Sequence, residues 1–357
     1  NAKINTSKGK QNKKHKHKTE VEKMLNVGVI GCGGMGKDHI KRLTEKIQGA
    51  QVVAVSDVFE EGAKEAAKIA GGAKVYTEGK DLINDPDVDA VFIVSPGFAH
   101  TESLLQAIEA GKRVFCEKPL ATTADDCKKI VEAEVASGKH LIQLGFMRRY
   151  DKGYVQVKEA LKSGEYGEPL ILHCTHRNPE VGTNYNTPMA VHDTAIHEID
   201  TLHWLVDDEY ESAQVIMPKV TKYSHSELKD PQIMLLRTKR GICIDVEVFV
   251  NCKFGYDINC EVVCEDGAIK MAQPSYPSIR KDAAVSTKID TDCFVRFTDA
   301  YDTEVQNWVD CAKDGVINGP TAWDGYLAAV TADALVKAQE TGQIEPIHTD
   351  EKPEFYK

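Results

Sequence analysis

Several kinds of segment are missing from this 357-residue sequence. No apolar run approaches the roughly eighteen residues that a membrane-spanning helix needs, and the first residues lack the apolar stretch of a signal peptide. None of the ten cysteines forms a CxxC pair, and most lie inside apolar, strand-like runs. We therefore expect a soluble, cytoplasmic protein whose thiols are reduced.

Acidic residues outnumber basic residues, 55 to 44, in the whole chain. The formal net charge is −11, although residues 1–23 contain eight lysines and only two glutamates. Because that leader carries +6, the remaining residues carry −17. A body this acidic repels nucleic acid and anionic membranes, so we expect neither as a partner. We interpret residues 1–23 as a tag or an upstream-translated segment rather than a nucleic-acid arm or targeting tail, and Met24 as the natural start.

The order of strand and helix patterns predicts two domains. Residues 24–146 alternate short β-branched runs with helical patterns, which is typical of a doubly wound α/β domain with a parallel sheet. Residues 147–345 bring strands close together, with a hairpin turn at residues 265–267. They predict an α+β domain with a large, mostly antiparallel open sheet. Residues 346–357 remain as a tail.

One predicted strand of the second domain, "CIDVEVFV", alternates strictly. Asp245 and Glu247 fall on one face, whereas Ile244, Val246 and Val248 fall on the other. A broad sheet with one partly exposed face commonly forms a subunit interface, so we expect a homo-oligomer, a tetramer, assembled through this sheet.

The segment "VGVIGCGGMGKDHI" follows a predicted strand and opens a helix. Its glycines have the GxGxxG spacing, which allows a tight turn and close approach of the backbone to a pyrophosphate at the helix N-terminus. A dinucleotide is therefore the expected cofactor. The predicted cofactor-binding turn comprises Gly31, Gly33, Gly34, Met35 and Gly36.

Asp57 closes the second predicted strand, twenty-one residues after Gly36. A carboxylate there accepts hydrogen bonds from an adenine-ribose diol and repels a 2′-phosphate, which favours NAD over NADP. In the alternative interpretation the glycines only make a turn and Asp57 caps the next helix. The spacing, the strand and the acid together favour the cofactor site.

The segment "VFCEKPLA" ends the fifth strand of the first domain. It places Glu117, Lys118 and Pro119 at the carboxyl edge of the sheet, where ligands of open α/β folds bind. A lysine on such an edge is, by itself, more often a solvated surface charge.

With this turn the sequence resembles the Gfo/Idh/MocA family of nucleotide-dependent oxidoreductases. The resemblance rests on the glycine turn, "SPGFAH" after the fourth strand, the "EKP" turn, and an Asp-x-x-x-His helix, and it covers residues 24–345. Within the family the segments "GFMRRYDKGY", "HRNP" and "DTAIHEIDTLHWLV" are most similar to inositol 2-dehydrogenases. The resemblance implies NAD-dependent oxidation of a cyclitol hydroxyl, most simply myo-inositol to 2-keto-myo-inositol.

The resemblance also implies roles for individual residues. Lys118 orients the reacting hydroxyl and contacts the cofactor, whose nicotinamide ribose lies near Ser95, Pro96, His100 and Glu117. The implied substrate contacts are Lys118, Met147, Arg148, His176, Asn178, Asp193, Thr194, His197 and Tyr256.

Asp193 and His197 are four residues apart in the predicted helix at residues 191–206, so they share one face. Oxidation of an alcohol requires removal of the hydroxyl proton, and an imidazole suits that task. We expect His197 to be the base and Asp193 to hold it in one tautomer. Activity is then expected to rise with pH through the histidine range. An ordinary surface pair is the alternative interpretation.

Other titratable residues of this helix have no assigned role in the reaction. We assign His192 and His203 to packing or hydrogen bonding, and we find no mechanistic need for Glu198. A metal site built from His192, Asp193, His197 and His203 is disfavoured because adjacent residues diverge by about 100° on a helix and the HExxH spacing is missing.

Two rival functions differ from myo-inositol oxidation. The first is a dehydrogenase for scyllo-inositol, another inositol isomer or a pyranose, since stereoisomers differ by the direction of one hydroxyl. The second is a dinucleotide-sensing regulator without turnover, which has no need for Lys118, Asp193 and His197 together.

Overall fold

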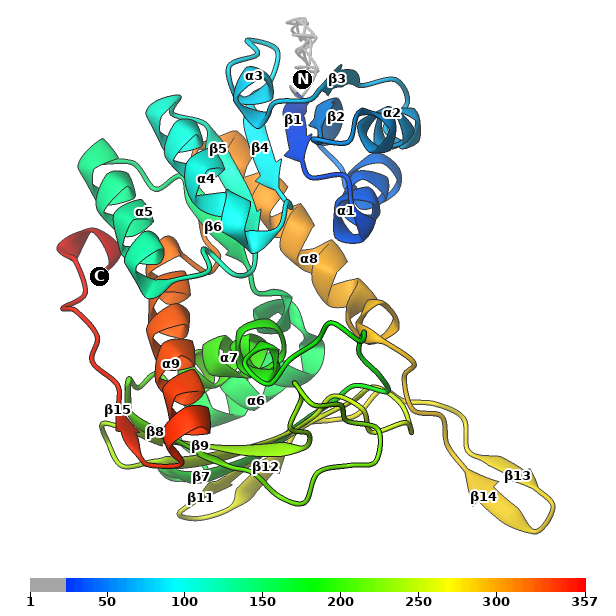
Figure 1. Ribbon diagram of the computed structural model, residues 1–357, viewed down its shortest axis with the longest axis vertical. Helices are drawn as coiled ribbons and strands as arrows, with labels where there is room; N and C mark the ends of the chain where they lie inside the picture. The colour runs from blue at the N-terminus through cyan, green and yellow to red at the C-terminus, as the bar shows by residue number, and fades with distance from the viewer. Residues whose placement is uncertain (1–23) are drawn as a thin grey trace, which may run out of the picture.

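The computed structural model describes residues 24–357 as two sheets with their helices (Figure 1). The leader, residues 1–23, lies outside the described residues. The first sheet is entirely parallel with the order β3-β2-β1-β4-β5-β6, which confirms the predicted doubly wound domain. Its strands are β1 (Leu25–Ile30), β2 (Ala50–Ser56), β3 (Lys74–Tyr76), β4 (Ala90–Ile93), β5 (Arg113–Glu117) and β6 (Ile142–Gly145).

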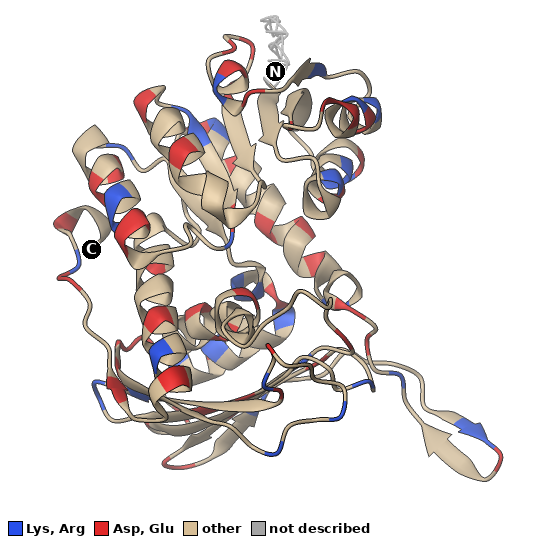
Figure 2. Cartoon of the chain, viewed as in Figure 1, with Lys and Arg blue, Asp and Glu red and all other residues tan. Residues whose placement is uncertain are grey.

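Helices between these strands cover the first sheet. They are α1 (Gly34–Glu45), α2 (Glu60–Ile69), α3 (Gly79–Ile83), η1 (Gly97–Ala99), α4 (His100–Glu109) and α5 (Ala124–Ser137). Every residue of β4 and β6 is buried, as expected for strands with apolar cover on both faces. In Figure 2 acidic and basic residues are interspersed along the outer faces of these helices.

The second sheet has the order β12-β11-β7-β10-β9-β8-β15, and β7 with β10 is its parallel pair. The predicted mostly antiparallel sheet is therefore confirmed, as is the hairpin turn between β11 and β12. Its strands are β7 (Pro169–Arg177), β8 (Tyr210–Ile216), β9 (Gln232–Thr238), β10 (Cys243–Phe249), β11 (Asp257–Cys264), β12 (Ala268–Lys270) and β15 (Glu345–Pro346). A separate hairpin, β13 (Ile279–Lys281) with β14 (Ala284–Ser286), projects from the body (Figure 1).

The two faces of the second sheet differ as the alternation in β10 predicts. Ile244, Val246 and Val248 are buried beneath helices, whereas the opposite face carries cross-strand ion pairs. On that face Arg177 donates to Glu247 at 2.6 Å. Helices lie on one side of this sheet and its other side is bare in Figure 1. The helices of this domain are η2 (Met147–Tyr150), α6 (Lys152–Ser163), η3 (Ala190–Ala195) and α7 (Ile196–Val206).

Two long helices near the C-terminus return to the first domain. They are α8 (Cys293–Asp314) and α9 (Ala322–Thr341), followed by η4 (Glu354–Tyr356). On α8, Trp308 is fully buried and packs edge-on against Phe92, which stacks on Phe115 at 4.5 Å between ring centroids. The apolar core of the first domain is thus completed by residues about 200 positions later in the chain.

No helix among residues 24–357 is long and apolar enough to cross a membrane. All ten cysteines are free thiols, and most are buried.

Candidate active site

The glycine turn between β1 and α1 is shaped by close backbone approaches. Gly31 has φ +96°, and a Cβ there would lie 2.5 Å from the Ser95 nitrogen. A Cβ on Gly36 would lie 1.9 Å from the Gly31 carbonyl oxygen. Above Gly33 and Gly34 the space is open, and α1 begins without a side-chain cap. The helix N-terminus thus has no side-chain cap and no crowding at these two glycines, as close approach of a pyrophosphate requires. Met35, the remaining residue of the turn, is half-buried.

Asp57 lies beside this turn at the end of β2. Its Oδ2 accepts a hydrogen bond from the Cys32 N–H at 2.7 Å, and its Oδ1 accepts one from the Phe59 N–H at 2.9 Å. The N-cap of α2 is Phe59, so Asp57 does not occupy the cap position of the alternative interpretation. Its carboxylate is held next to the open glycine turn, where it disfavours an extra phosphate.

Replacement of Asp57 by serine tests the cofactor preference. We expect Asp57→Ser to raise the ratio of kcat/KM with NADP to kcat/KM with NAD by about tenfold or more, because a repulsive charge is removed. Steady-state rates with both cofactors measure this ratio. Asp57→Glu, which keeps the charge, is the matched control, and an unchanged ratio in Asp57→Ser would count against the assignment.

Two loops at the carboxyl edge of the first sheet are joined by His100. Its Nδ1 lies 2.7 Å from the Pro119 carbonyl oxygen, and its Nε2 lies 2.7 Å from the Ser95 carbonyl oxygen. His100 is completely buried, so it shapes the predicted nicotinamide site only through these loops. The Oγ of Ser95 is buried without a partner, whereas Pro96 is exposed.

Lys118 extends from the end of β5 toward the second domain. Its Nζ donates to the Asp193 carboxylate at 2.9 Å and to the Asp193 carbonyl oxygen at 3.1 Å. Asp193 therefore pairs with Lys118, and the Nδ1 of His197 has no hydrogen-bond partner. The expected role of Asp193 in fixing the tautomer of His197 is corrected by this geometry.

The reason for that correction is local. The predicted helix over residues 191–206 begins as the π-helical turn η3 and becomes α-helical only at Ile196. Bonding from i to i+5 widens the turn, so residues four apart no longer stack on one face as they do in an α-helix. Asp193 accordingly reaches Lys118 of the first domain, while the ring of His197 lies 6.4 Å from that of His176.

His197 is half-buried beside other positive groups. Burial, and then the charges of Lys118, Arg148 and His176, hold the pKa of its imidazole well below the ordinary value of 6.5. The ring is therefore neutral at neutral pH, as a proton acceptor must be. The acid limb of the pH–activity profile is then expected below the ordinary histidine range, which corrects the expectation of a rise within it.

A buried cluster lies behind His197. Arg148 and Glu198 form an ion pair, and Glu198 Oε2 lies 2.8 Å from Nδ1 of His176. The hydroxyl of Tyr256 lies 3.5 Å from the other nitrogen of His176, and the His176 ring is 6.4 Å from that of His197. Burial opposes the charge of Glu198, but Arg148 and His176 outweigh it and hold the pKa of its carboxyl below the usual range.

Two implied substrate contacts lie in or beside this cluster. Arg148 has no exposed surface and Met147 is 1% exposed. The Arg148 guanidinium is paired with Glu198 and lies 3.1 Å from Nδ1 of His176. Thr194 is also buried, with its hydroxyl 2.5 Å from that of Tyr185, and Asn178 is half-buried at the end of β7. Contacts of Met147, Arg148, His176, Asn178, Thr194 and Tyr256 with substrate remain predictions.

The two histidines assigned to packing have local partners. His192 lies 3.9 Å from Asp333 of α9, and the ring of His203 lies 5.9 Å from that of Tyr210. Glu198, for which the sequence predicts no role in the reaction, pairs with Arg148 and His176 in the buried cluster. Its burial could have been predicted, because Glu198 shares an apolar helix face with Ala195, Leu202 and Leu205.

Glu304 of α8 is a further buried acid that sequence analysis missed. Neither carboxyl oxygen has a hydrogen-bond partner, and the side chain is fully buried. Burial, and then the charge of Glu117, raise the pKa of Glu304 well above its ordinary value of 4.5. The folded protein therefore holds a proton that the unfolded chain releases as pH rises above 4.5.

Replacing this acid is expected to stabilise the protein at neutral and basic pH. Since the unfolded chain binds fewer protons in that range, the wild type loses about 1.4 kcal/mol of unfolding free energy per pH unit between the two pKa values. Glu304→Gln escapes this loss, so its advantage should be larger at pH 8 than at pH 5 in urea unfolding. The exposed Glu109→Gln serves as control. A pH-independent loss of stability in Glu304→Gln would contradict the protonated state.

Two family models together match most of this chain. Residues 25–146 match the model of an oxidoreductase family with an NAD-binding Rossmann fold, and residues 158–348 match the model of its C-terminal α/β domain. The chain belongs to the Gfo/Idh/MocA oxidoreductase family. The predicted family membership is confirmed, and the first sheet with its glycine turn is the family's NAD-binding domain.

Individual members of the Gfo/Idh/MocA family are similar over nearly the whole chain. An inositol 2-dehydrogenase of Pseudomonas syringae pv. syringae is 54% identical, with 93% of this chain and 99% of that protein covered. The crystal structure of myo-inositol dehydrogenase from Lactobacillus casei with NAD(H) and myo-inositol has a TM-score of 0.92 at 44% identity, covering 94% and 100% of the two chains. The scyllo-inositol dehydrogenase of Lactobacillus casei with NAD(H) and scyllo-inositol has a TM-score of 0.85 at 25% identity, covering 91% and 99%.

Proposed function

We propose that this protein is an NAD-dependent inositol 2-dehydrogenase that oxidises myo-inositol to 2-keto-myo-inositol. The observation that carries the proposal is the Lys118–Asp193 contact at 2.9 Å, which places an ammonium group of the NAD-binding domain against η3, the turn that leads into the His197 helix α7. The similarity to a myo-inositol dehydrogenase, at 44% identity, exceeds the 25% identity to the scyllo-inositol enzyme and favours the myo isomer.

The residues present fit NAD. The backbone around Gly33 and Gly34 is open, the α1 N-terminus is uncapped, and Asp57 stands beside it to accept hydrogen bonds from the ribose. When bound, NAD supplies the hydride acceptor, while the protein supplies position and proton transfer. Gly31, Gly33, Gly34, Met35, Gly36, Asp57, Ser95, Pro96, Glu117 and Lys118 would hold it.

The proton chemistry is assigned to three side chains. His197, neutral because its pKa is lowered, accepts the hydroxyl proton of the substrate as the carbon is oxidised. Lys118 places a positive charge beside the developing alkoxide, which lowers the barrier by electrostatic stabilisation. Asp193 holds the Lys118 ammonium in place and is open to a substrate hydroxyl, since its side chain is 55% exposed.

A turnover assay with a panel of polyols tests the proposal. We expect reduction of NAD, followed by absorbance of the reduced nicotinamide, to be fastest with myo-inositol among myo-inositol, scyllo-inositol, chiro-inositol and glucose. A faster rate with another member would reassign the substrate. Binding of NAD without turnover on any of the four would favour the sensing role.

We further propose that the protein assembles as a tetramer through the bare face of the second sheet and is located in the cytoplasm. The exposed Ile171 on the bare side of β7 and the projecting β13–β14 hairpin, with Val285 65% exposed, support the assembly. The free thiols support the location. Light scattering coupled to gel filtration measures the assembly, and a monomer would contradict it.

A further inference from the structure

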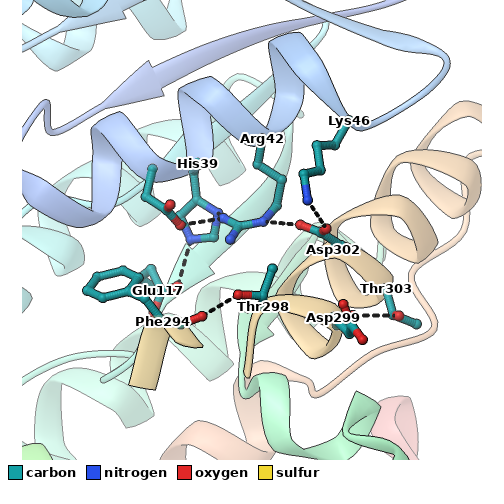
Figure 3. A network of polar contacts seen from close by, with 10 residues as sticks. His39, Arg42, Lys46, Glu117, Phe294, Thr298, Asp299, Asp302 and Thr303 are labelled. Atoms are coloured by element: carbon teal, nitrogen blue, oxygen red, sulfur yellow. Dashed lines mark hydrogen bonds and ion pairs between the residues drawn. The ribbon is translucent and has the colours of Figure 1, made fainter. Parts of the chain in front are cut away.

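A chain of polar contacts behind the Lys118 turn links the cofactor helix α1 to β5 and α8 (Figure 3). At its centre the Nε2 of His39 lies 2.8 Å from Oε1 of Glu117. His39 has no exposed surface and Glu117 is 6% exposed. The imidazole is enclosed by aromatic rings, with the centroids of Phe92 and Phe115 each 5.6 Å away. Such a pair is built into the interior, where an unpaired polar group is costly.

The geometry fixes which nitrogen of His39 carries the proton. Nη1 of Arg42 lies 3.2 Å from Nδ1 of His39, and a guanidinium can only donate. Nδ1 is therefore the acceptor, so the proton is on Nε2 and is donated to Glu117. Arg42 is itself held by Asp38 at 2.7 Å and by Asp302 of α8 at 2.8 Å. The tautomer is thus set by residues of two helices.

Glu117 connects His39 to the main chain of the next residue, Lys118. Its second oxygen, Oε2, accepts a hydrogen bond from the backbone N–H of Lys118 at 3.2 Å. The carboxylate thereby spans His39 on one side and the main chain of Lys118 on the other. The helix α1 begins at the glycine turn, where a pyrophosphate is expected to bind. Through His39 and Glu117, the same helix is connected to the main chain of Lys118.

We propose that His39 is a positioning residue for Lys118, acting through the Glu117 carboxylate, and that Arg42 and Asp302 hold it in the required tautomer. The inference rests on the proposed role of Lys118 in the reaction. A displacement of a catalytic group by about 1 Å can cost two orders of magnitude in rate, so a relay of this kind has measurable consequences.

Three variants separate positioning from packing. His39→Leu removes both hydrogen bonds, and we expect kcat to fall about tenfold or more while the Kd for NAD changes little. His39→Gln keeps an amide donor for Glu117 and an oxygen for Arg42, so it should recover most of kcat. Arg42→Met removes the donor to Nδ1 without opening a cavity among the rings, and it should give a smaller loss of kcat.

A double-mutant cycle with Lys118→Met shows whether the loss of kcat in His39→Leu depends on Lys118. If His39 acts through Lys118, the loss of kcat from His39→Leu disappears in the Lys118→Met background. An equal loss in both backgrounds, or the same kcat for His39→Leu and His39→Gln, would overturn the proposal. If His39→Leu does not fold, Arg42→Met is carried through the same cycle with the same criteria. Parental activity of Lys118→Met alone would instead overturn the proposed role of Lys118, which keeps the two failures apart.

Discussion

His197→Ala is expected to lower kcat for myo-inositol oxidation by about 10²- to 10⁴-fold, the usual contribution of a general base. NAD binding should persist, because His197 lies in the second domain and its nearest ring neighbour is His176, at 6.4 Å between centroids. The buried Nδ1 of His197 has no partner, so truncation to alanine breaks no hydrogen bond of that atom. The expected loss is therefore chemical rather than structural.

Turnover rates, NAD titration and pH profiles together measure this effect. The wild type should keep its activity below pH 6.5, since the lowered pKa leaves His197 neutral there, and the acid limb should vanish in His197→Ala. Added imidazole should restore part of the rate. His203→Ala, on the same helix, is the matched control and should retain activity. A parental rate in His197→Ala would show that another group accepts the proton.

Lys118→Met is expected to lower kcat by about 10²- to 10³-fold, in the range observed when one preorganised stabilising group is removed. The variant also tests the electrostatics of the site. The positive charge of Lys118 is one cause of the low pKa of His197, so its removal should raise that pKa and shift the acid limb to higher pH. A lower rate and a shifted limb from one substitution would connect the two residues across the domains.

A second lysine–aspartate pair in the same chain provides the control. Lys74 donates to Asp87 at 2.7 Å on the surface, as Lys118 does to Asp193, but it lies at the outer edge of the first sheet. Lys74→Met should leave kcat and the pH profile unchanged. A limb that stays in place in Lys118→Met would mean that burial alone sets the pKa of His197.

Local patterns predicted the elements that depend on neighbours in sequence. The alternation in β10 and the GxGxxG spacing at Gly31 reflect backbone geometry and side-chain direction, which act over a few residues. The strand–helix rhythm of residues 24–146 similarly implied the parallel sheet, since such strands need cover on both faces. The carboxyl-edge position of Lys118 followed from that topology.

The contact partners of individual side chains could not be predicted from these local patterns. Spacing placed Asp193 beside His197, but a π-helical turn directs it to Lys118, 75 residues earlier in the chain. His39 and Glu117 are separated by 78 residues, and Arg42 and Asp302 by 260. Spacing within one segment carries no information on such pairs, because they form only when separate elements pack.

The sequence by itself determined the family, the doubly wound domain, the open sheet and the residue types of the site, because motif spacing and hydrophobic periodicity are local properties. The tertiary structure decided which groups carry charge and which side chains contact one another. Burial and charged neighbours lower the pKa of His197, and Glu198 pairs with Arg148 and His176 in a buried cluster. Both effects depend on distances across two domains, and those distances are fixed only when α8 and η3 pack against the sheets.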